Sequence, residues 1–184
     1  MRIIAGTARG RRLQAPPGRD TRPTLDRVRE ALFSSWAARV PGSRFLDLYA
    51  GSGANGLEAR SRGAETVVLV DRDARALEVI RRNVAGTGLT GDIRVVQARL
   101  PEELLRLGGP FDLIFADPPY AFEAHEALLT AIASTRLLAE EGVLCLEHGR
   151  TVDLPDAVAG LSRRRVRPYG GTVLSLYGWE SAGP

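Results

Sequence analysis

The chain has 184 residues, of which 44% are hydrophobic and 26% are charged, and its formal net charge is +3. This length and composition predict a globular protein with one sizeable core. No apolar stretch approaches the roughly 18 residues that span a bilayer, and the N-terminal residues lack the apolar core of a signal peptide, so we expect a cytoplasmic protein. The one cysteine, Cys145, lies in an apolar run, which excludes a disulfide framework and favours a buried, inert thiol. No cluster of metal-ligating residues has the spacing of a metal site, so we expect no metal.

All 25 basic residues are arginine, and they concentrate near the two ends of the chain. Residues 1–29 hold eight arginines against two acids (net +6), residues 30–162 hold 13 against 19 (net −6), and residues 163–184 hold four against one (net +3). A basic segment at each end favours a phosphate-rich partner such as a nucleic acid. The alternative interpretation is a solvated basic arm without a partner.

The N-terminal residues carry the signals of a small β-hairpin, a linker and a helix. Two short segments, Arg2–Ala5 and Arg11–Gln14, are separated by glycines and predict the hairpin. Prolines and a glycine make Ala15–Thr21 an extended linker. Thr24 is a candidate N-cap for a helix that runs to about Arg39, with apolar residues at helical spacing.

Three arginines, Arg22, Arg27 and Arg29, lie near the start of this predicted helix. Cations at that end oppose the helix dipole, so helix stability does not explain them. Phosphate binding and ordinary surface charge are the two interpretations that stay open.

From residue 45 onward, strands and helices alternate along the chain. The predicted strands are Phe45–Tyr49, Thr66–Asp71, Ile93–Gln97, Phe111–Ala116, Val143–Glu147, Arg163–Tyr169 and Thr172–Trp179. The predicted helices that follow the second to fourth strands are Ala74–Ala85, a short one around Glu102–Leu107, and Ala121–Arg136. This order implies a mostly parallel sheet with right-handed crossovers, closed by an antiparallel hairpin. Ligands then bind beyond the carboxyl ends of the strands, where we expect Gly51, Asp71, Gln97, Asp117 and Glu147–His148 to face one crevice.

Residues 45–58, FLDLYAGSGANGLE, combine a buried strand, a glycine-rich turn and the start of a helix, as in a nucleotide-binding βαβ unit. The turn has the spacing GxGxxG from Gly51 to Gly56, and Asp71 ends the next strand. This spacing also fits a dinucleotide-binding fold, in which the acid accepts hydrogen bonds from ribose hydroxyls. Asp47 argues against that alternative, because it lies inside the first strand, where a buried carboxylate needs a partner.

The fourth predicted strand ends in Asp117-Pro118-Pro119-Tyr120, a turn that hydride chemistry does not require. Two consecutive prolines fix φ and donate no hydrogen bond, so the turn is rigid and leaves carbonyl groups available as acceptors. A carboxylate and carbonyls suit the N–H hydrogens of an exocyclic base amine, and Tyr120 can stack on the base. Asp-Pro-Pro also occurs as a purely structural turn. Its combination with the glycine loop and Asp71, each at the end of a strand, favours the catalytic interpretation.

With these motifs the chain resembles S-adenosylmethionine (SAM) dependent methyltransferases that modify exocyclic amines. More narrowly, it resembles the RsmD family, bacterial methyltransferases acting on guanine N2 in 16S ribosomal RNA. The resemblance covers nearly the whole chain, and Arg22–Phe33 is its most specific stretch. The matching segments are Met1–Gly6, Arg9–Leu13, Arg22–Thr24, Asp26–Glu30, Leu32–Phe33, Ala50–Gly53, Gly56–Ala59, Asp117–Tyr120, and Tyr169–Gly170 with the closing hairpin.

The resemblance implies an α/β, Rossmann-like class I methyltransferase fold with a mostly parallel seven-stranded sheet, a C-terminal antiparallel hairpin and a small N-terminal hairpin and helix extension. It implies a basic RNA-binding arm and linker over residues 1–23 and a SAM-dependent methyltransferase domain over residues 24–184. SAM is the implied cosubstrate, and no metal is implied. The implied partner is 16S rRNA within an assembling small ribosomal subunit, and we expect a monomer.

The site residues that the resemblance implies fall into three groups. Asp47 and the Gly51–Gly53 loop would hold the methionine end of SAM, and Asp71 the ribose hydroxyls. The catalytic group that presents the target amine is Asp117, Pro118, Pro119 and Tyr120. The full SAM-binding group is Asp47, Ala50, Gly51, Ser52, Gly53, Asp71, Arg72, Arg99 and Leu100. The RNA-binding group is Arg9, Arg11, Arg12, Arg22, Thr24, Arg27 and Arg29.

One departure from the family pattern concerns the adenine of SAM. Related enzymes often place Asp or Asn after the third strand to accept a hydrogen bond from the adenine amine, whereas Arg99 stands in the corresponding stretch here. An arginine side chain has no acceptor. The backbone N–H of Leu100 is the remaining candidate for contact with the ring.

The two histidines receive no catalytic role. His148 follows the fifth strand, and we assign it a structural or rim role, because a methylated arylamine can lose its proton to water after transfer. His125, on a predicted helix, is expected at the surface.

Two other functions stay open. A DNA adenine-N6 methyltransferase shares the glycine loop and the Asp-Pro-Pro-Tyr turn, but it usually needs a separate target-recognition domain. A non-enzymatic RNA-binding protein with a relict Rossmann core shares the basic ends.

Overall fold

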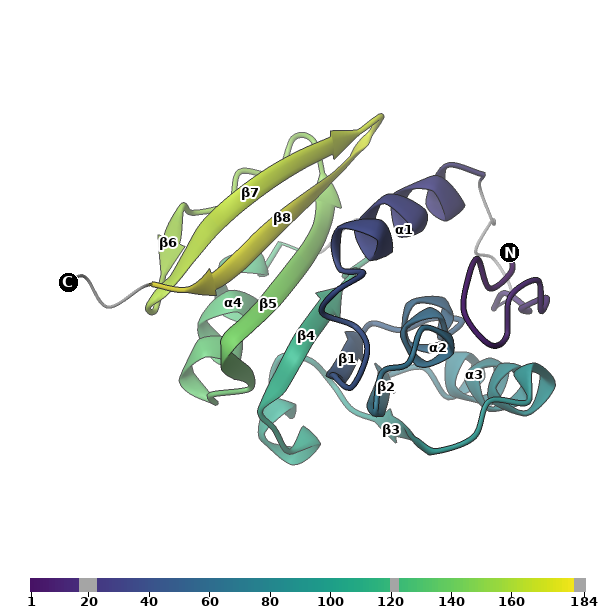
Figure 1. The fold of residues 1–184 in the computed structure, drawn as a ribbon. Coiled ribbons are helices and arrows are strands. Elements are labelled where there is room, and N and C mark those ends of the chain that lie inside the picture. The colour runs from purple at the N-terminus through teal and green to yellow at the C-terminus, as the bar shows by residue number, and fades with distance from the viewer. Residues whose placement is uncertain (17–22, 120–122, 181–184) are drawn as a thin grey trace. The chain divides into compact units, whose positions relative to one another are not determined.

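A computed structural model describes residues 1–16, 23–119 and 123–180 of the chain (Figure 1). The chain divides into two compact units, Met1–Ala98 and Arg99–Pro184. Each unit combines helices with parallel strands, and the second unit adds antiparallel strands. The predicted mixed α/β class is therefore confirmed.

Unit 1 contains a three-stranded parallel ladder and three helices among its described residues. Its elements are α1 (Pro23–Ser35), β1 (Arg44–Leu48), α2 (Ala54–Ser61), β2 (Thr66–Asp71), α3 (Ala74–Thr87) and β3 (Asp92–Gln97). The strand order is β3-β2-β1, and Val67 of β2 lies opposite both Phe45 and Ile93. The whole run Val67–Val70 is buried, as expected of a parallel strand that is covered on both faces. Helix α2 contacts β1 and β2, and α3 contacts β2 and β3 (Figure 1).

The ends of α3 follow from local sequence. The Asp73 carboxylate accepts a hydrogen bond from the Arg75 N–H at 2.9 Å and so caps the first turn. Gly88 follows the last turn with φ 68°, a left-handed conformation that favours glycine.

Helix α1 ends at Ser35, before the predicted end at Arg39. The N–H groups of Arg39 and Val40 both donate to the carbonyl of Trp36, which tightens the chain into turns. The residue after Val40 is a proline, which disfavours the helical conformation at Val40.

An aromatic cluster links α1 to β1. The Phe33 ring stacks on Phe45 with a centroid distance of 5.9 Å, and Trp36 meets both rings edge-on. All three side chains are buried. Val28 and Leu32, which share the predicted helical spacing with Trp36, are also buried, so the predicted apolar face is a packed face.

Unit 2 contains one parallel strand pair that continues into antiparallel strands. Its elements are a 3-10 helix η1 (Leu104–Leu107), β4 (Phe111–Ala116), α4 (His125–Ser134), β5 (Leu138–Gly149), β6 (Ala157–Val158), β7 (Leu161–Tyr169) and β8 (Thr172–Trp179). Strands β4 and β5 are parallel, and β5-β8-β7-β6 are antiparallel neighbours. The predicted C-terminal hairpin is confirmed by β7 and β8.

Four predictions that involve the elements of unit 2 need correction. The short helix predicted around Glu102–Leu107 is a 3-10 turn, and α4 begins at His125 and ends at Ser134, inside the predicted 121–136 range. Residues 121 and 122 of that range lie outside the described residues. Strand β5 runs from Leu138 to Gly149 and so extends beyond both ends of the predicted Val143–Glu147. The two-residue β6 brings the strands in the described residues to eight, one more than the seven predicted.

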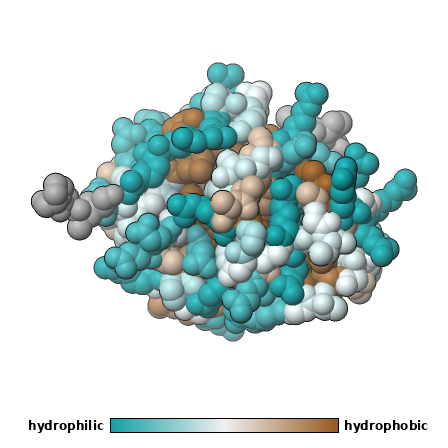
Figure 2. Space-filling view, in the orientation of Figure 1, coloured by the Kyte–Doolittle hydropathy of each residue, from teal (hydrophilic) through white to brown (hydrophobic). Residues whose placement is uncertain are grey.

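The surface is mostly polar on the face that Figure 2 shows, where hydrophobic residues form small separate areas. In the described part of the chain, the large hydrophobic side chains that are exposed are Leu105 and Val166. No helix within residues 1–16, 23–119 or 123–180 is both long and apolar enough to cross a membrane.

Candidate functional site

The N-terminal segment is packed onto the first unit. The predicted hairpin is reduced to one antiparallel bridge, between Arg2 and Arg12. The side chains of Ile3 and Leu13 are buried in a small core with Leu57 of α2. This segment therefore has a fixed place beside α2 and α3 (Figure 1).

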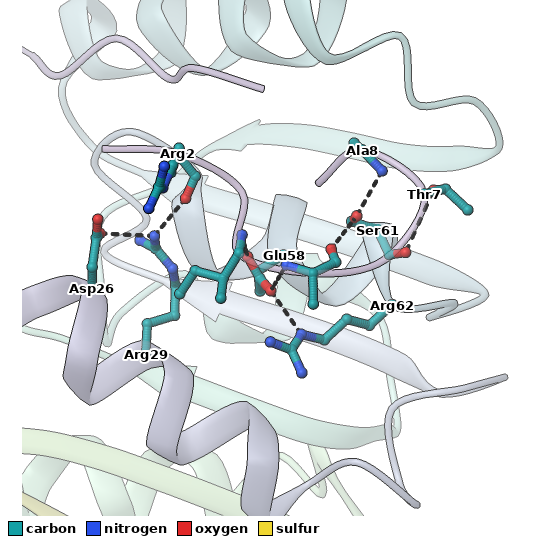
Figure 3. A network of polar contacts seen from close by, with 10 residues as sticks. Arg2, Thr7, Ala8, Asp26, Arg29, Glu58, Ser61 and Arg62 are labelled. Atoms are coloured by element: carbon teal, nitrogen blue, oxygen red, sulfur yellow. Dashed lines mark hydrogen bonds and ion pairs between the residues drawn. The ribbon is translucent and has the colours of Figure 1, made fainter. Parts of the chain in front are cut away.

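Glu58 of α2 holds the N-terminal segment through a buried carboxylate. Its side chain is 0% exposed and accepts hydrogen bonds from the backbone N–H groups of Ile4 at 2.7 Å and Ala5 at 3.0 Å. It also forms an ion pair with Arg62 at 2.7 Å (Figure 3). The hydroxyl of Ser61 adds to the network by donating to the Ala5 carbonyl at 2.6 Å. The carboxylate thus satisfies two backbone donors and one guanidinium at once.

Sequence reasoning missed this role of Glu58 and Ser61. Glu58 lies in the family segment Gly56–Ala59 but was predicted only as part of a helix, and Ser61 received no role. The available signal was their place on the buried side of a short helix whose remaining neighbours are small and apolar.

Arg29 differs from the other arginines that we expected to bind RNA. Its side chain is 5% exposed, and its guanidinium donates to the Arg2 carbonyl at 2.7 Å and to the Asp26 carboxylate at 2.9 Å (Figure 3). It therefore links α1 to the N-terminal segment, and we remove it from the RNA-binding group. The predicted residues of this group that are exposed are Arg9, Arg11, Arg12 and Arg27. Arg22 lies outside the described residues, and the side chain of Thr24 is not described.

The glycine loop after β1 takes the conformation that its sequence predicts. Gly51 has φ 59° and Gly53 has φ 77°, both in the left-handed region that favours glycine. Tyr49 precedes them with φ 60°, a conformation that few non-glycine residues adopt. The chain therefore makes a sharp turn between the end of β1 and the start of α2.

Asp71, at the end of β2, is fixed against this loop. Its carboxylate is 7% exposed and accepts the N–H of Gly51 at 2.9 Å and the N–H of Asp73 at 3.0 Å. An ionised carboxylate has about four lone-pair sites, so two remain for a ligand. These two hydrogen bonds fix the orientation of the Asp71 carboxylate, and its remaining lone pairs can accept hydrogen bonds from a ligand.

The carboxylate of Asp47 has the partner that its position inside β1 requires. It accepts the N–H of Gly56 at 2.9 Å. Gly56 itself is needed for packing, because a Cβ there would lie 2.3 Å from a methyl carbon of Leu69. Asp47 therefore sets the direction of α2 relative to β1.

Asn83 of α3 completes the support of the loop. Its side-chain amide donates to the Ser52 carbonyl and the Gln14 carbonyl, each at 2.9 Å, and its oxygen accepts the Gln14 N–H at 2.8 Å. This residue was also missed from sequence. A polar residue on the buried stripe of α3 was the signal that could have found it.

The other predicted SAM-binding residues are divided between the two units, and some are buried while others are exposed. In unit 1, Ala50 donates its N–H to the Val70 carbonyl, Ser52 is buried, and Arg72 is exposed at the end of β2. In unit 2, Arg99 is exposed and its N–H donates to Glu103 at 2.7 Å. Leu100 is buried, and its contact with a ligand stays a prediction.

In unit 2, the predicted catalytic turn follows β4. Asp117 is half-buried, Pro118 is buried and Pro119 is exposed, while Tyr120 lies outside the described residues. The parallel pairing of Ala116, the last residue of β4, with Leu146 of β5 places Asp117 beside Glu147. The gathering of both units' strand-end residues around one crevice stays a prediction.

Both histidines have structural surroundings. His148 bonds through its two ring nitrogens to the Ser175 hydroxyl and to the Gly149 carbonyl, each at 2.9 Å. Because the carbonyl needs a donor, Nδ1 carries the proton and Nε2 accepts from Ser175. The expectation of a surface His125 is wrong, since this side chain is buried at the start of α4. Burial, and to a lesser degree His148, lowers the pKa of His125.

Comparison with known proteins places the chain among methyltransferases. It is 39% identical over 180 residues to the Bacillus subtilis protein named "Putative rRNA methyltransferase YlbH", covering 96% of this chain and 98% of the relative. It is 36% identical over 183 residues to "Ribosomal RNA small subunit methyltransferase D" of Escherichia coli, covering 100% of this chain and 92% of the relative. Among solved structures, "Putative methyltransferase yhhF" from Escherichia coli superposes with a TM-score of 0.85 at 35% identity, covering 98% of each chain. These similarities support the Rossmann-like methyltransferase fold.

A family model described as "Conserved hypothetical protein 95" matches residues 1–178. The match spans both units, from the N-terminal segment to the last strand. The chain therefore belongs to this family, which is the RsmD family that its motifs resemble.

Proposed function

We propose that this protein transfers a methyl group from SAM to the exocyclic N2 of a guanine in 16S rRNA, within an assembling small ribosomal subunit. The observation that carries the proposal is the Asp117-Pro118-Pro119 turn after β4, in a chain that matches a small-subunit rRNA methyltransferase along its whole length. The enzyme acts as a monomer, in the cytoplasm.

Residues of unit 1 fit the binding of SAM. Asp71 is fixed by two backbone N–H groups and keeps lone pairs for the two ribose hydroxyls. The loop from Ala50 to Gly53 presents backbone without bulky side chains at the point where β1 turns into α2. Asp47, held by the Gly56 N–H, brings negative charge near the loop that suits the cationic methionine end.

When bound, SAM supplies an electrophilic methyl group on a sulfonium sulfur; transfer breaks the sulfur–carbon bond, forms a nitrogen–carbon bond and releases one proton. The guanine amine is a weak nucleophile, because its lone pair is delocalised into the ring. We assign Asp117 and the carbonyl groups of the proline turn to accept the N–H hydrogens of this amine. These hydrogen bonds orient the nitrogen and favour its pyramidal form, which stabilises the transition state. The proton is then lost to water.

The exposed arginines of the N-terminal segment, Arg9, Arg11 and Arg12, together with Arg27 of α1, bind RNA phosphates in this proposal. Their guanidinium groups face solvent, and the segment that carries them is held in place by Glu58 and Asn83. A fixed basic surface loses less conformational entropy on binding than a disordered arm. We also assign Arg22 and Thr24 to RNA binding, because they lie in a segment that matches the family.

Mass mapping of 16S RNA after incubation with enzyme and SAM tests the proposal. We expect one added methyl group on one guanine when small-subunit particles are the substrate. Methylation of adenine in DNA would support the alternative DNA methyltransferase. RNA binding without SAM binding or transfer would support the non-enzymatic alternative.

Asp71→Ala should weaken SAM binding by about 1.5–3 kcal/mol, because it removes a charged acceptor of two hydroxyl hydrogen bonds. Calorimetric titration with SAM measures the change. Asp73→Ala is the matched control: it removes a nearby carboxylate that caps α3 and should leave SAM affinity unchanged. Equal SAM affinity in Asp71→Ala and the parent would show that β2 does not carry the ribose acceptor.

Replacing Arg9, Arg11 and Arg12 by alanine should weaken RNA binding and flatten its salt dependence. Each lost phosphate contact should lower the slope of log K against log salt by up to about 0.7–0.9. SAM affinity should persist, because none of the three side chains is buried in unit 1. A triple variant of the exposed Arg75, Arg81 and Arg94 makes the same change in net charge and is the control. If both triple variants have the same salt slope, the N-terminal arginines do not bind RNA phosphates and are ordinary solvated surface charges.

A further inference from the structure

Glu147 stands beside Asp117 because of the register of two parallel strands. Phe115 pairs with Cys145, and Ala116, the last residue of β4, pairs with Leu146, so Asp117 directly follows β4 next to Glu147 of β5. Residues paired across neighbouring strands direct their side chains to the same face of the sheet. The register therefore brings the Asp117 carboxyl, just past the end of β4, near the Glu147 carboxyl of β5, and the charge of Asp117 acts on Glu147.

The surroundings of Glu147 in unit 2 are closed and mostly uncharged. Its side chain is 9% exposed. On its own strand the residue on the same face is Cys145, whose thiol is buried, and from β8 the facing residues are Leu174 and Thr172. The Thr172 hydroxyl donates a hydrogen bond to Glu147. His148 lies on the opposite face of β5, where it bonds Ser175.

Asp117 is thus the charged group that faces Glu147 among the described residues of unit 2. Burial first, and then the negative charge of Asp117, raise the pKa of Glu147 to about 8, against the smaller opposing effect of the Thr172 hydroxyl. At neutral pH most Glu147 side chains therefore carry a proton. A carboxylic acid beside a carboxylate is a hydrogen-bond donor facing an acceptor, whereas two carboxylates would repel.

We propose that Glu147 is a positioning residue for methyl transfer: its protonated carboxyl donates a hydrogen bond to the Asp117 carboxylate and fixes it toward the target amine. This inference rests on the proposed function, because it assumes that Asp117 receives the amine. One oxygen of Asp117 is held by Glu147, and the other accepts an N–H hydrogen of the base. The backbone rigidity of Pro118 and Pro119 fixes the main chain, and Glu147 fixes the side chain.

The inference predicts an alkaline limit to the reaction. The folded-state pKa of Glu147 is raised, so the hydrogen bond is present below pH about 8 and is lost as the pH rises through that value. Ionised Glu147 repels Asp117 and turns it away from the amine. Single-turnover methylation of 16S RNA particles, followed across the neutral and alkaline range, should show a rate that falls above pH about 8.

Glu147→Gln is the decisive variant, because its amide still donates to Asp117 but does not ionise. We expect a rate within a few-fold of the parent near neutral pH and no alkaline fall. Glu147→Ala removes the donor and should slow transfer on the order of tenfold to a hundredfold, the range for a misplaced catalytic group. Glu140→Gln, an exposed residue of the same strand, should leave both the rate and the pH profile unchanged.

A second measurement does not depend on activity. The ionisation of Glu147, followed by carboxyl carbon NMR of isotope-labelled protein, should have a pKa near 8 in the parent and a lower one in Asp117→Asn. An alkaline fall in Glu147→Gln like that of the parent, or equal losses in Gln and Ala with an unchanged pH profile, would overturn the positioning role. Failure of the proposed function looks different: the parent would not methylate 16S RNA, or Asp117→Ala would keep its rate.

Discussion

Asp117→Ala should slow methyl transfer by at least about a hundredfold while SAM affinity stays within a few-fold of the parent. Removal of one hydrogen-bonding group that acts in the transition state typically costs this much in rate. Asp117 is assigned to the amine and has no assigned contact with SAM, so the loss should appear in the chemical step. Single-turnover methylation of reconstituted small-subunit particles, with SAM binding measured in parallel, gives both quantities.

Two further variants sharpen this test. Asp117→Asn keeps an oxygen acceptor but not the charge, and it should retain more activity than Asp117→Ala and less than the parent. Asp112→Asn changes an exposed carboxylate on the same strand and should leave transfer unchanged. A rate of methyl transfer in Asp117→Ala close to that of the parent would show that Asp117 does not orient the target amine.

Glu58→Ala should lower the free energy of unfolding by about 3–5 kcal/mol, the typical cost of removing one partner of a buried ion pair. The variant leaves the guanidinium of Arg62 and the N–H groups of Ile4 and Ala5 without their acceptor. Denaturant unfolding followed by circular dichroism measures the loss. Because Ile3 packs beside Leu57, protease cleavage in the N-terminal segment should also become faster.

A surface ion pair on the next helix is the matched control for Glu58. Glu78 and Arg82 of α3 are also four residues apart, but their side chains are 61% and 57% exposed. Glu78→Ala should cost only about 0.3–0.5 kcal/mol, because water and ions screen such pairs. Equal stability losses in Glu58→Ala and Glu78→Ala would show that the N-terminal segment does not depend on the buried carboxylate.

Strands were the most predictable part of this fold. Thr66–Asp71, Phe111–Ala116 and Thr172–Trp179 have the predicted bounds, because each is an apolar run closed by glycine, proline or charged residues. The left-handed glycines of the loop after β1 were predictable for a similar reason. Their backbone conformation is a local property, and a side chain at those positions would strain it.

Helix ends and the burial of polar residues were less predictable. The tight turns after Ser35 depend on hydrogen bonds to one carbonyl, and the burial of His125 depends on what packs over the start of α4. Neither is encoded in the helical period of the chain. The role of Arg29 was unpredictable for a similar reason. From sequence, an arginine near the start of a helix can be either a phosphate ligand at the surface or a buried hydrogen-bond donor.

By itself, the sequence determined the α/β class, the glycine loop with Asp71, the proline turn with Asp117 and the family. These features depend on residues that are close together in the chain or on spacing that repeats along it. Only the tertiary structure decided that Glu58 holds the backbone of Ile4 and Ala5, and which residues pair where β4 ends, Ala116 with Leu146. The physical reason is that such contacts join residues dozens of positions apart. Their existence depends on the register of strands and the packing of helices, which no local pattern specifies.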